Sequence, residues 1–501
     1  MSNRSTTLRW TRRALVAAAF TLLLLGLALQ LLAQFEPEDL PAPAKPSALV
    51  FTNVSIVDLR DEAGHIIPKQ WVVIVNGRIA SLGAEGSHPL PADATVIDAT
   101  GKYLMAGLWD AHIHTLRLSP QLHLPLLLAQ GVTSVRDMGN TCSWSSDPGC
   151  RSPIPQWRER IEGGHMVGPR LLQSSSFHLE EIPLEPGALQ TRIAALKLAG
   201  EPFLKLQLDG QTSTADFARV LAVAQAQGLP VAGHLPHALD LLQLPHQAIS
   251  SIEHDWSLLP QCADDRPHFD GRNRSKAALL AGLNPQRCEA VLARLAEQGS
   301  LYVPTHIAST GQDARLAQGG DPEVAALADR YVPEPQRWLW ALMRLAGKAS
   351  PQEQAMLTQV HLAALKLTQQ AHAAGVVVLA GTDALDADVL HGFSLHTELQ
   401  HLVAAGLTPA QALAAATWRP AQAFGVGSQL GTVEVGKLAD LLLLQANPLA
   451  DIRNTRQIEA VVADGRIYGA QERAAAMAFV ADQAQRWRVM SRFVAGLWMS
   501  F

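Results

Sequence analysis

Residues 107–114 read Gly-Leu-Trp-Asp-Ala-His-Ile-His, and the expected fold follows from them. The apolar run Tyr-Leu-Met-Ala at 103–106 leads directly into this stretch, which predicts a buried β-strand whose end carries His112 and His114. Residues i and i+2 of a strand point to the same face, so both imidazoles can bind one metal ion. Imidazole is a common ligand of Zn²⁺ and related ions. Alone, the pair is a weak signal, since two histidines can equally face a core or a loop.

Other reactive residues stand at or near the ends of later apolar segments. Lys205 lies at the centre of a short apolar strand, and His234 and His254 end two others. Asp383 ends the apolar run at 376–383. A parallel α/β barrel forms its active site at the carboxyl ends of its strands. The order of these residues therefore predicts that they meet at one mouth of such a barrel.

The order His-x-His, Lys, His, His, Asp on successive strands resembles the amidohydrolase superfamily, and most closely its prolidase and imidazolonepropionase-like branch. The segments at 131–139, 168–172 and 395–441 are similar to that branch as well. The resemblance covers roughly residues 47–469, and the ordered motif set is highly specific. It implies an α/β fold: a distorted (β/α)8 TIM barrel with a small composite β-sandwich built from both flanks.

The resemblance also implies a site for two divalent ions, with Zn²⁺ as the favoured metal, although N/O ligation also admits Mn, Co or Fe. A buried lysine near metal ions has a lowered pKa, so its neutral amine can capture CO₂ and become an anionic ligand. Each residue also has an alternative role. Lys205 can be an ordinary lysine beside a single metal, His234 and His254 can be core histidines with hydrogen-bond partners, and Asp383 can cap a helix. The implied ligands are His112, His114 and Asp383 on one metal, His234 and His254 on the other, and Lys205 bridging both as a carbamate.

The mechanism implied by the resemblance is attack by a metal-bridged hydroxide. Paired metals share and acidify one water, and one of them polarises the substrate carbonyl. Asp383 takes the proton of the water and returns it to the departing amine, because an amide anion is a very poor leaving group. The predicted function is a metal-dependent amidohydrolase that cleaves an amide or peptide bond, of the X-Pro dipeptide or N-acyl amino acid type.

Other functions are compatible with the same residues. A hydrolase of a cyclic amide, lactone or ester would keep the metal centre and change the pocket, because the ligand set does not fix the substrate. Deamination is disfavoured, since a bridging lysine suits a two-metal hydrolase. An inactive barrel retained as an anchored binding protein is disfavoured by the complete ligand set.

The small-molecule substrate would be contacted by loops at the strand ends. A substrate carboxylate needs an Arg or Tyr donor, for which the sequence offers Arg117, Arg136 and Tyr302 without choosing among them. Further histidines stand near these loops, where a plain loop position is favoured over substrate contact: His237, His306, His391 and His396.

Residues 1–34 differ in composition from the rest. Arginines at 4, 9, 12 and 13 precede an apolar run at 14–33. A run of about 20 residues can cross a bilayer and exceeds the usual signal-peptide core of about 7–15. This predicts an N-terminal transmembrane helix, partnered with the membrane, and an exported body facing the periplasm or exterior. A cleaved signal peptide, with secretion, is the alternative. It is disfavoured because Leu31 spoils the small-x-small site near Ala33.

Charge and cysteine content agree with an exported globular protein. The net charge is −5, and no basic stripe indicates a nucleic-acid partner. Cys142 and Cys150 bracket a short loop, and Cys262 and Cys288 bracket a polar insertion. Two local disulfides are therefore predicted for an oxidising compartment, although three pairings are possible and four free thiols are the alternative. The oligomeric state is left open, a homo-oligomer included.

The chain of 501 residues is too long for one ordinary domain and suits a barrel with a small satellite. Short strands separated by turns, among them the Asn-Gly pair at 76–77, indicate a β unit before the barrel. The predicted organisation is an anchor or signal segment at 1–34, a linker at 35–46, the first segment of the β-sandwich at 47–106, the hydrolase barrel at 107–425, the second segment of the β-sandwich at 426–469 and a helical tail at 470–501.

Overall fold

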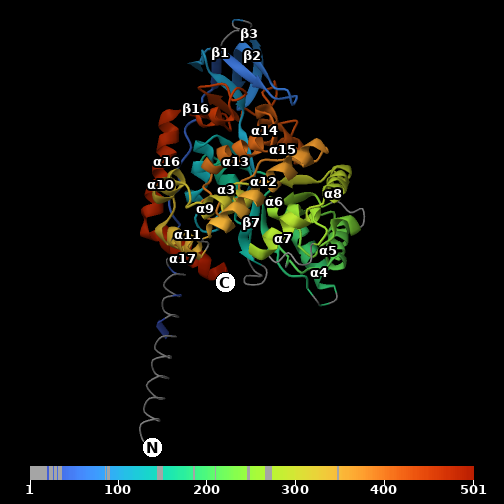
Figure 1. The fold of residues 1–501 in the computed structure, drawn as a ribbon. Helices are drawn as coiled ribbons and strands as arrows, with labels where there is room; N and C mark the ends of the chain where they lie inside the picture. Colours follow the sequence, from blue (N-terminus) through green and yellow to red (C-terminus); the bar gives the residue numbers. More distant parts are fainter. Residues whose placement is uncertain are drawn as a thin grey trace, which may run out of the picture.

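The computed structural model describes residues 36–84, 86, 91–143, 151–183, 185, 187–208, 210–244, 249–265, 273–346 and 349–500, together with four single positions before residue 36. A small β unit lies above a larger α/β body (Figure 1). The blue and orange-red colours of the small unit show that it contains segments from both sides of the barrel sequence.

The larger body is built on parallel strands in the order β14-β13-β12-β11-β10-β9-β7-β6, with β8 beside β7. Most are short and buried on both faces, which suits their apolar sequences. The strands are β6 (Leu108–Ile113), β7 (Val132–Ser143), β8 (Arg170–Leu171), β9 (Ser175–Leu179), β10 (Leu204–Leu206), β11 (Val231–Gly233), β12 (Ser251–Glu253), β13 (Leu301–Val303) and β14 (Val377–Val378).

The two ends of this sheet meet. The backbone N–H of Ala111 donates to the carbonyl of Ala380 at 2.9 Å, and Ile113 forms a parallel bridge with Ala384. The segment that follows β14 therefore lies beside β6, and the sheet closes into a barrel whose strand ends share one mouth.

Helices cover the outside of the barrel. Several helices follow residues that favour a helix start. The side chain of Ser213 caps the helix that begins at Thr214, and Ser350 and Thr408 form capping boxes at the helices that begin at Pro351 and Pro409. The helices are α2 (Leu124–Ala129), α3 (Ile154–Glu162), α4 (Ala188–Leu198), α5 (Thr214–Ala226), α6 (Asp255–Leu258), α7 (Asn273–Gly282), α8 (Pro285–Gln298), α9 (Thr310–Ala317), α10 (Pro322–Tyr331), α11 (Glu334–Ala346), α12 (Pro351–Ala373), α13 (Phe393–Ala404), α14 (Pro409–Ala415) and α15 (Trp418–Ala423).

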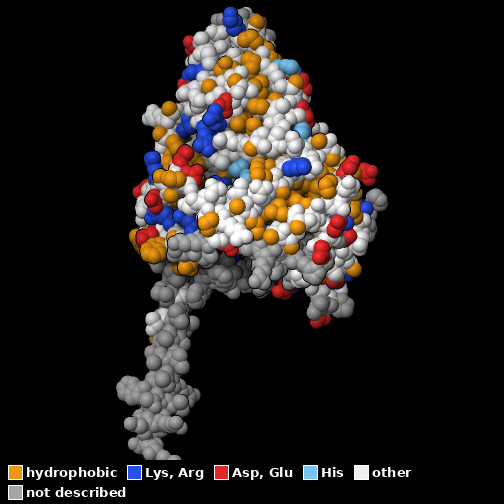
Figure 2. Space-filling model, in the orientation of Figure 1, with side chains coloured by type: hydrophobic (Ala, Val, Ile, Leu, Met, Phe, Trp, Pro, Cys, Tyr) orange, Lys and Arg blue, Asp and Glu red, His pale blue; other side chains and the backbone are white. Residues whose placement is uncertain are grey.

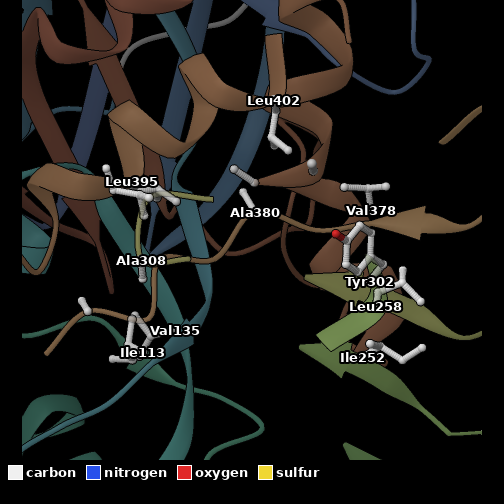
Figure 3. Packing of buried hydrophobic residues seen from close by; sticks show 14 of the residues in the cluster. Ile113, Val135, Ile252, Leu258, Tyr302, Ala308, Val378, Ala380, Leu395 and Leu402 are labelled. Carbon is white, nitrogen blue, oxygen red and sulfur yellow. The ribbon is translucent and has the colours of Figure 1, made fainter. Parts of the chain in front are cut away.

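The main core lies between the barrel and these helices. Figure 3 shows Tyr302 of β13 among apolar neighbours that include Val378 of β14 and Leu258 of α6, with Leu402 of α13 above them. Tyr302 and Val378 are both fully buried. Side chains of alternate strand residues point outward into this core, so they cannot reach the mouth of the barrel.

The small β unit is one sheet in the order β17-β16-β15-β5-β1-β2-β3, with β4 beside β1. Phe51, Leu443 and Val462 belong to its own apolar core. The turn at Asn76 and Gly77, both with positive φ, joins two of its strands. The strands are β1 (Ala48–Asp58), β2 (His65–Val75), β3 (Arg78–Ala84), β4 (Ala94–Asp98), β5 (Tyr103–Ala106), β15 (Leu441–Leu444), β16 (Ile458–Ala463) and β17 (Arg466–Tyr468).

Two helices, α16 (Ala470–Gln485) and α17 (Trp487–Ser500), end the chain. Val480 and Ala484 of α16 pack on Leu126 of α2, and Arg473 donates to the carbonyl of Ala129 at 2.8 Å. The tail therefore packs against the body.

The predicted transmembrane helix has to be corrected. Among the residues that the structure describes, no helix is long and apolar enough to cross a membrane. The prediction rested on residues 1–34, and all but four of these lie outside the described residues. An apolar run shows only that its burial would be favourable, and does not itself establish a continuous spanning helix. The part of the chain that the structure describes is therefore an α/β fold with a parallel barrel sheet, and no membrane span is found within it.

Of the two predicted disulfides, one lies within the described residues. Cys262 and Cys288 are bonded, and they join the end of the 3₁₀ turn at Leu259–Cys262 to α8 across a sequence separation of 26. Cys150 lies outside the described residues, so the pairing of Cys142 stays a prediction.

Replacing both Cys262 and Cys288 by Ala should lower the free energy of unfolding by about 3 kcal/mol, because the unfolded chain regains the freedom of a closed loop. Denaturant unfolding of the oxidised protein measures this difference. A reductant should bring the wild type toward the variant. A variant as stable as the oxidised wild type would contradict the expectation.

Candidate metal centre

All the predicted ligands lie at the same end of the barrel. His112 belongs to β6, and Lys205 is the central residue of β10. The others follow strand ends: His114 after β6, His234 after β11, His254 after β12 and Asp383 after β14. Because the strands are parallel, their carboxyl ends converge, and side chains distant in sequence become neighbours.

Two glycines allow this convergence. Gly233 precedes His234 with φ +140°, and a Cβ there would lie 2.2 Å from the carbonyl oxygen of Leu206. At Gly381, two residues before Asp383, a Cβ would lie 2.8 Å from that of His112. Any larger side chain would push neighbouring strands apart at the level of the site.

One carboxylate oxygen joins the first group of ligands. Oδ1 of Asp383 lies 3.2 Å from Nε2 of His112 and 3.0 Å from Nε2 of His114. Ligands bound to one ion at about 2.0–2.2 Å are separated by distances of this order. The three side chains are therefore placed to share one ion.

The hydrogen bonds of these histidines show where a positive charge is needed. Nδ1 of His112 donates to a carboxylate oxygen of Glu253 at 2.8 Å, and Nδ1 of His114 donates to the carbonyl of Gly139 at 3.0 Å. With Nδ1 protonated, each neutral ring turns a lone pair at Nε2 toward the carboxylate of Asp383. Nε2 of His112 is buried without a hydrogen-bond partner among the described residues. A bound cation, or an added proton, must lie between these groups.

The second pair of ligands is equally close. Nε2 of His234 lies 3.0 Å from Nε2 of His254, whose Nδ1 contacts the hydroxyl of Thr305 at 2.7 Å. The rings of His112 and His254 are 4.7 Å apart, centroid to centroid. Ligand atoms of His112, His254 and Asp383 all lie within 4.8 Å of one another. The two groups of ligands thus form one cluster.

The amine of Lys205 is buried and has no hydrogen-bond partner among the described residues, although a buried charge would need one. The residue is 2% exposed, and its Nζ is buried without a hydrogen bond to any described residue. Burial lowers the pKa of Lys205 to about 8, although the nearby charges of Glu253 and Asp383 oppose that shift. Buried polar groups are nearly always hydrogen-bonded, so this amine fits a group that another ligand completes.

Burial and the neighbouring imidazoles shift the pKa of Asp383 in opposite directions. Burial alone would raise its pKa, but the neighbouring imidazoles of His254, His112 and His114 outweigh burial and hold the pKa well below its usual value. The carboxylate therefore stays ionised, as a metal ligand must.

The backbone is strained at this cluster. His254 and Asp383 have φ of +70° and +60°, and Thr305 has +46°. Non-glycine residues rarely adopt this conformation, and such strain concentrates at functional sites. Here it turns both ligands inward after their strands end.

Sequence reasoning missed Glu253 and Trp256. Glu253 is fully buried beneath His112, and Trp256 stacks on the ring of His254 with centroids 5.4 Å apart and planes 8° apart. The available signals were a glutamate inside an apolar strand and an aromatic two residues after a predicted ligand. Both side chains hold the histidines in place.

Three of the residues predicted to contact substrate occupy different positions relative to the barrel mouth. Arg136 is 3% exposed and pairs with Glu253, and Tyr302 is buried in the outer core, where burial raises its pKa well above the usual value. Neither faces the mouth of the barrel. His237 is half-buried, with its ring 6.0 Å from that of Trp256, and remains beside the ligands.

The other three predicted histidines, His306, His391 and His396, form hydrogen bonds within the barrel and its helices. Nε2 of His391 donates to the carbonyl of His114 at 2.8 Å, which supports the backbone of that ligand. His306 is enclosed between Asp255 and Thr368, and His396 between Gln130 and Thr455.

A pocket of about 970 Å³ lies at the opposite end of the barrel. Its lining includes residues that precede strands, such as Phe203, Pro230 and Ser250, and none of the predicted ligands. In the face shown in Figure 2, hydrophobic side chains gather around α8, α12 and α15, where this pocket lies. This pocket does not open onto the ligand cluster.

Zn²⁺ should stabilise the metal-free protein, because an ion that binds only the folded state shifts the folding equilibrium. At 100 times the dissociation constant, the free energy of unfolding should rise by about 2.7 kcal/mol per site, measured by thermal unfolding. His114→Ala should reduce this gain. His65→Ala, on an exposed histidine paired with Asp61, should leave it unchanged. Equal gains in both variants would contradict the assigned ligands.

Comparisons with known proteins agree with this geometry. The sequence model of the Amidohydrolase family matches residues 341–468. An adenine deaminase from Rubrobacter xylanophilus is 23% identical over 437 residues, covering 84% of this chain and 58% of the relative. Adenine deaminase 3 from Rhizobium meliloti is 36% identical over 76 residues, 15% of this chain and 12% of the relative. The chain thus spans less than two thirds of the length of these curated relatives.

Solved structures share the fold over most of the chain. A putative prolidase from Bifidobacterium longum is 24% identical with a TM-score of 0.58, covering 88% of this chain and all of that one. A bottromycin amidohydrolase is 21% identical with a TM-score of 0.68, covering 92% of this chain and 94% of that one. The family match over residues 341–468, the shared fold and the placement of the predicted ligands at one barrel mouth support the predicted resemblance to the amidohydrolase superfamily.

Proposed function

We propose that this protein is a metal-dependent hydrolase that cleaves an amide bond, with X-Pro dipeptides or N-acyl amino acids as its substrate class. The observation that carries the proposal is the buried amine of Lys205, which has no hydrogen-bond partner among the described residues and lies beside a carboxylate and imidazoles that are placed to share ions. An ammonium would repel nearby cations, whereas the carbamate formed from its neutral amine is an anionic ligand for both.

The residues present fit a pair of divalent ions. His112, His114 and Asp383 would hold one ion, His234 and His254 the other, and Lys205 would bridge them, with Zn²⁺ as the metal that suits this N/O set. Bound metals supply an acidified water and a polarised substrate carbonyl.

Asp383 is the proton carrier in this proposal. Its Oδ1 faces His112 and His114, whereas its Oδ2 lies 3.7 Å from Nδ1 of His254 and is the less engaged oxygen. Oδ2 takes the proton of the attacking water and passes it to the departing amine nitrogen. His234 and His254, backed by Trp256, orient the opposite side of the site.

Among the structures of similar fold, one is described as a putative prolidase and another as a Xaa-Pro dipeptidase with methionine bound in its active site; the latter is 17% identical to this chain, with a TM-score of 0.57. These neighbours support the fold, and their names motivate the dipeptide class. A cyclic amide, lactone or ester is the alternative within the same chemistry, since the metal centre does not fix pocket shape.

Deamination is the second candidate, because the curated relatives are named adenine deaminase. A deaminase releases ammonia from a base, whereas a dipeptidase releases two amino acids and a lactam opens to a single molecule. Elemental analysis of the purified protein, followed by product analysis over dipeptides, N-acyl amino acids, lactams and adenine, separates these functions. Absence of bound divalent metal would overturn the whole proposal.

Export of the protein is also proposed, and the Cys262–Cys288 disulfide supports it because disulfides persist mainly in oxidising compartments.

Asp383→Asn should lower kcat by about 10²–10⁴-fold, because the amide cannot carry the proton. The folded protein should persist, as checked by circular dichroism. Asp440→Asn, on a buried aspartate paired with Arg170 outside the site, is the matched control and should keep turnover. Full activity of Asp383→Asn would contradict the assigned proton carrier.

Lys205→Ala should reduce the bound metal toward one ion per chain or fewer, because the bridging anion is lost. Elemental analysis measures the ratio. Lys276→Ala removes a lysine that pairs with Asp313 and should leave the ratio unchanged. Two ions per chain in Lys205→Ala would exclude the bridge.

A further inference from the structure

We propose that Glu253, held in place by Arg136, is the positioning residue that fixes His112 with its proton on Nδ1 and its lone pair on Nε2, facing the metal. This inference rests on the proposed function and deepens it. Glu253 touches neither substrate nor metal in this assignment, and it acts through the ring of His112.

Both carboxylate oxygens of Glu253 have partners. Its Oε2 accepts from Nδ1 of His112 at 2.8 Å, and its Oε1 accepts from Nη1 of Arg136 at 3.0 Å. The hydroxyl of Ser251 donates to Oε1 and accepts from Nη2 of Arg136. Glu253 and His112 have no exposed surface, and water therefore cannot replace either partner.

Arg136 reaches this network from the opposite end of the barrel. Its guanidinium carbon lies 4.4 Å from the ring centroid of Phe203 and 5.1 Å from that of Phe424. Both rings line the pocket at the amino ends of the strands. Aromatic faces on the guanidinium and a carboxylate at its tip hold the charge inside the barrel. Arg136 is thus part of the barrel floor, and it cannot bind a substrate carboxylate at the mouth.

The arrangement decides which nitrogen of His112 is free. A carboxylate only accepts, so Nδ1 must carry the proton and Nε2 must present its lone pair. A carboxylate behind a ligating histidine fixes the ring and raises its basicity, and loss of such a partner costs about 10–100-fold in metal affinity.

Stability alone would not require this pair. Replacing a buried ion pair by apolar residues of similar size is often neutral for folding or stabilising, whereas removing one member leaves an unpaired buried charge. If the pair had only a structural role, apolar residues in place of Arg136 and Glu253 would therefore give a barrel of similar stability. The charged pair is needed where its carboxylate must accept from His112.

The test compares two double variants that lose the same charges. The amide variant combines Arg136→Met with Glu253→Gln and keeps an oxygen that accepts from Nδ1 of His112. The thioether variant combines Arg136→Met with Glu253→Met and has a side chain of similar size without such an acceptor. The Zn²⁺ affinity of each protein is measured by competition with a chromophoric chelator, together with thermal unfolding.

We expect both variants to fold with similar midpoints, and the thioether variant to bind Zn²⁺ about 10–100-fold more weakly than the amide variant. Equal affinities would mean that the network is only structural and would overturn the proposal. Wild-type protein that binds no Zn²⁺ at all would instead overturn the proposed function, and this inference with it.

A second measurement holds even if the thioether variant fails to fold. Nitrogen-15 NMR of histidine-labelled, metal-free wild type reports which ring nitrogen carries the proton, with the signals of His112 assigned by their absence in His112→Gln. A proton on Nδ1 supports the proposal, and a proton on Nε2 alone overturns it.

Discussion

The site depends on one electrostatic constraint: lone pairs of imidazole nitrogens face the carboxylate of Asp383 at distances that leave no room for a water between them. His112 and His114 commit their Nδ1 protons to Glu253 and to the carbonyl of Gly139. Their Nε2 atoms both lie within 3.2 Å of one oxygen of Asp383. Such an arrangement is stable only with a positive charge in the centre, and divalent cations supply it without needing a proton.

The barrel is what makes this constraint possible. Parallel strands deliver His112, Lys205, His234, His254 and Asp383 to one mouth, and glycines at 233 and 381 let the strand ends approach closely. A second layer then holds the first. Thr305 contacts His254, the ring of Trp256 stacks on it, and His391 holds the backbone of His114. Below them, Glu253 and Arg136 close the barrel interior.

Much of this layout could be predicted from local patterns. Apolar runs ending in His, Lys or Asp indicated strand ends, and their order indicated one shared site. Two predicted substrate contacts proved to be buried. The sequence alone did not show to which side of their strands Arg136 and Tyr302 point. Arg136 faces the barrel interior, whereas Tyr302 faces the outer core. The predicted transmembrane helix is not found among the described residues; it was inferred from the hydropathy of residues 1–34 alone, most of which lie outside them.

By itself, the sequence determined the types of the candidate ligands, their order along the chain and the alternation of strands and helices, because these depend on residue chemistry and local periodicity. Only the tertiary structure decided which ring nitrogen of His112 and His114 is free, and that Lys205 has no hydrogen-bond partner among the described residues. It also decided that Glu253 lies behind His112 and that Cys262 pairs with Cys288. Those properties arise from contacts between segments far apart in the chain, and their distances and burial exist only once the barrel has closed.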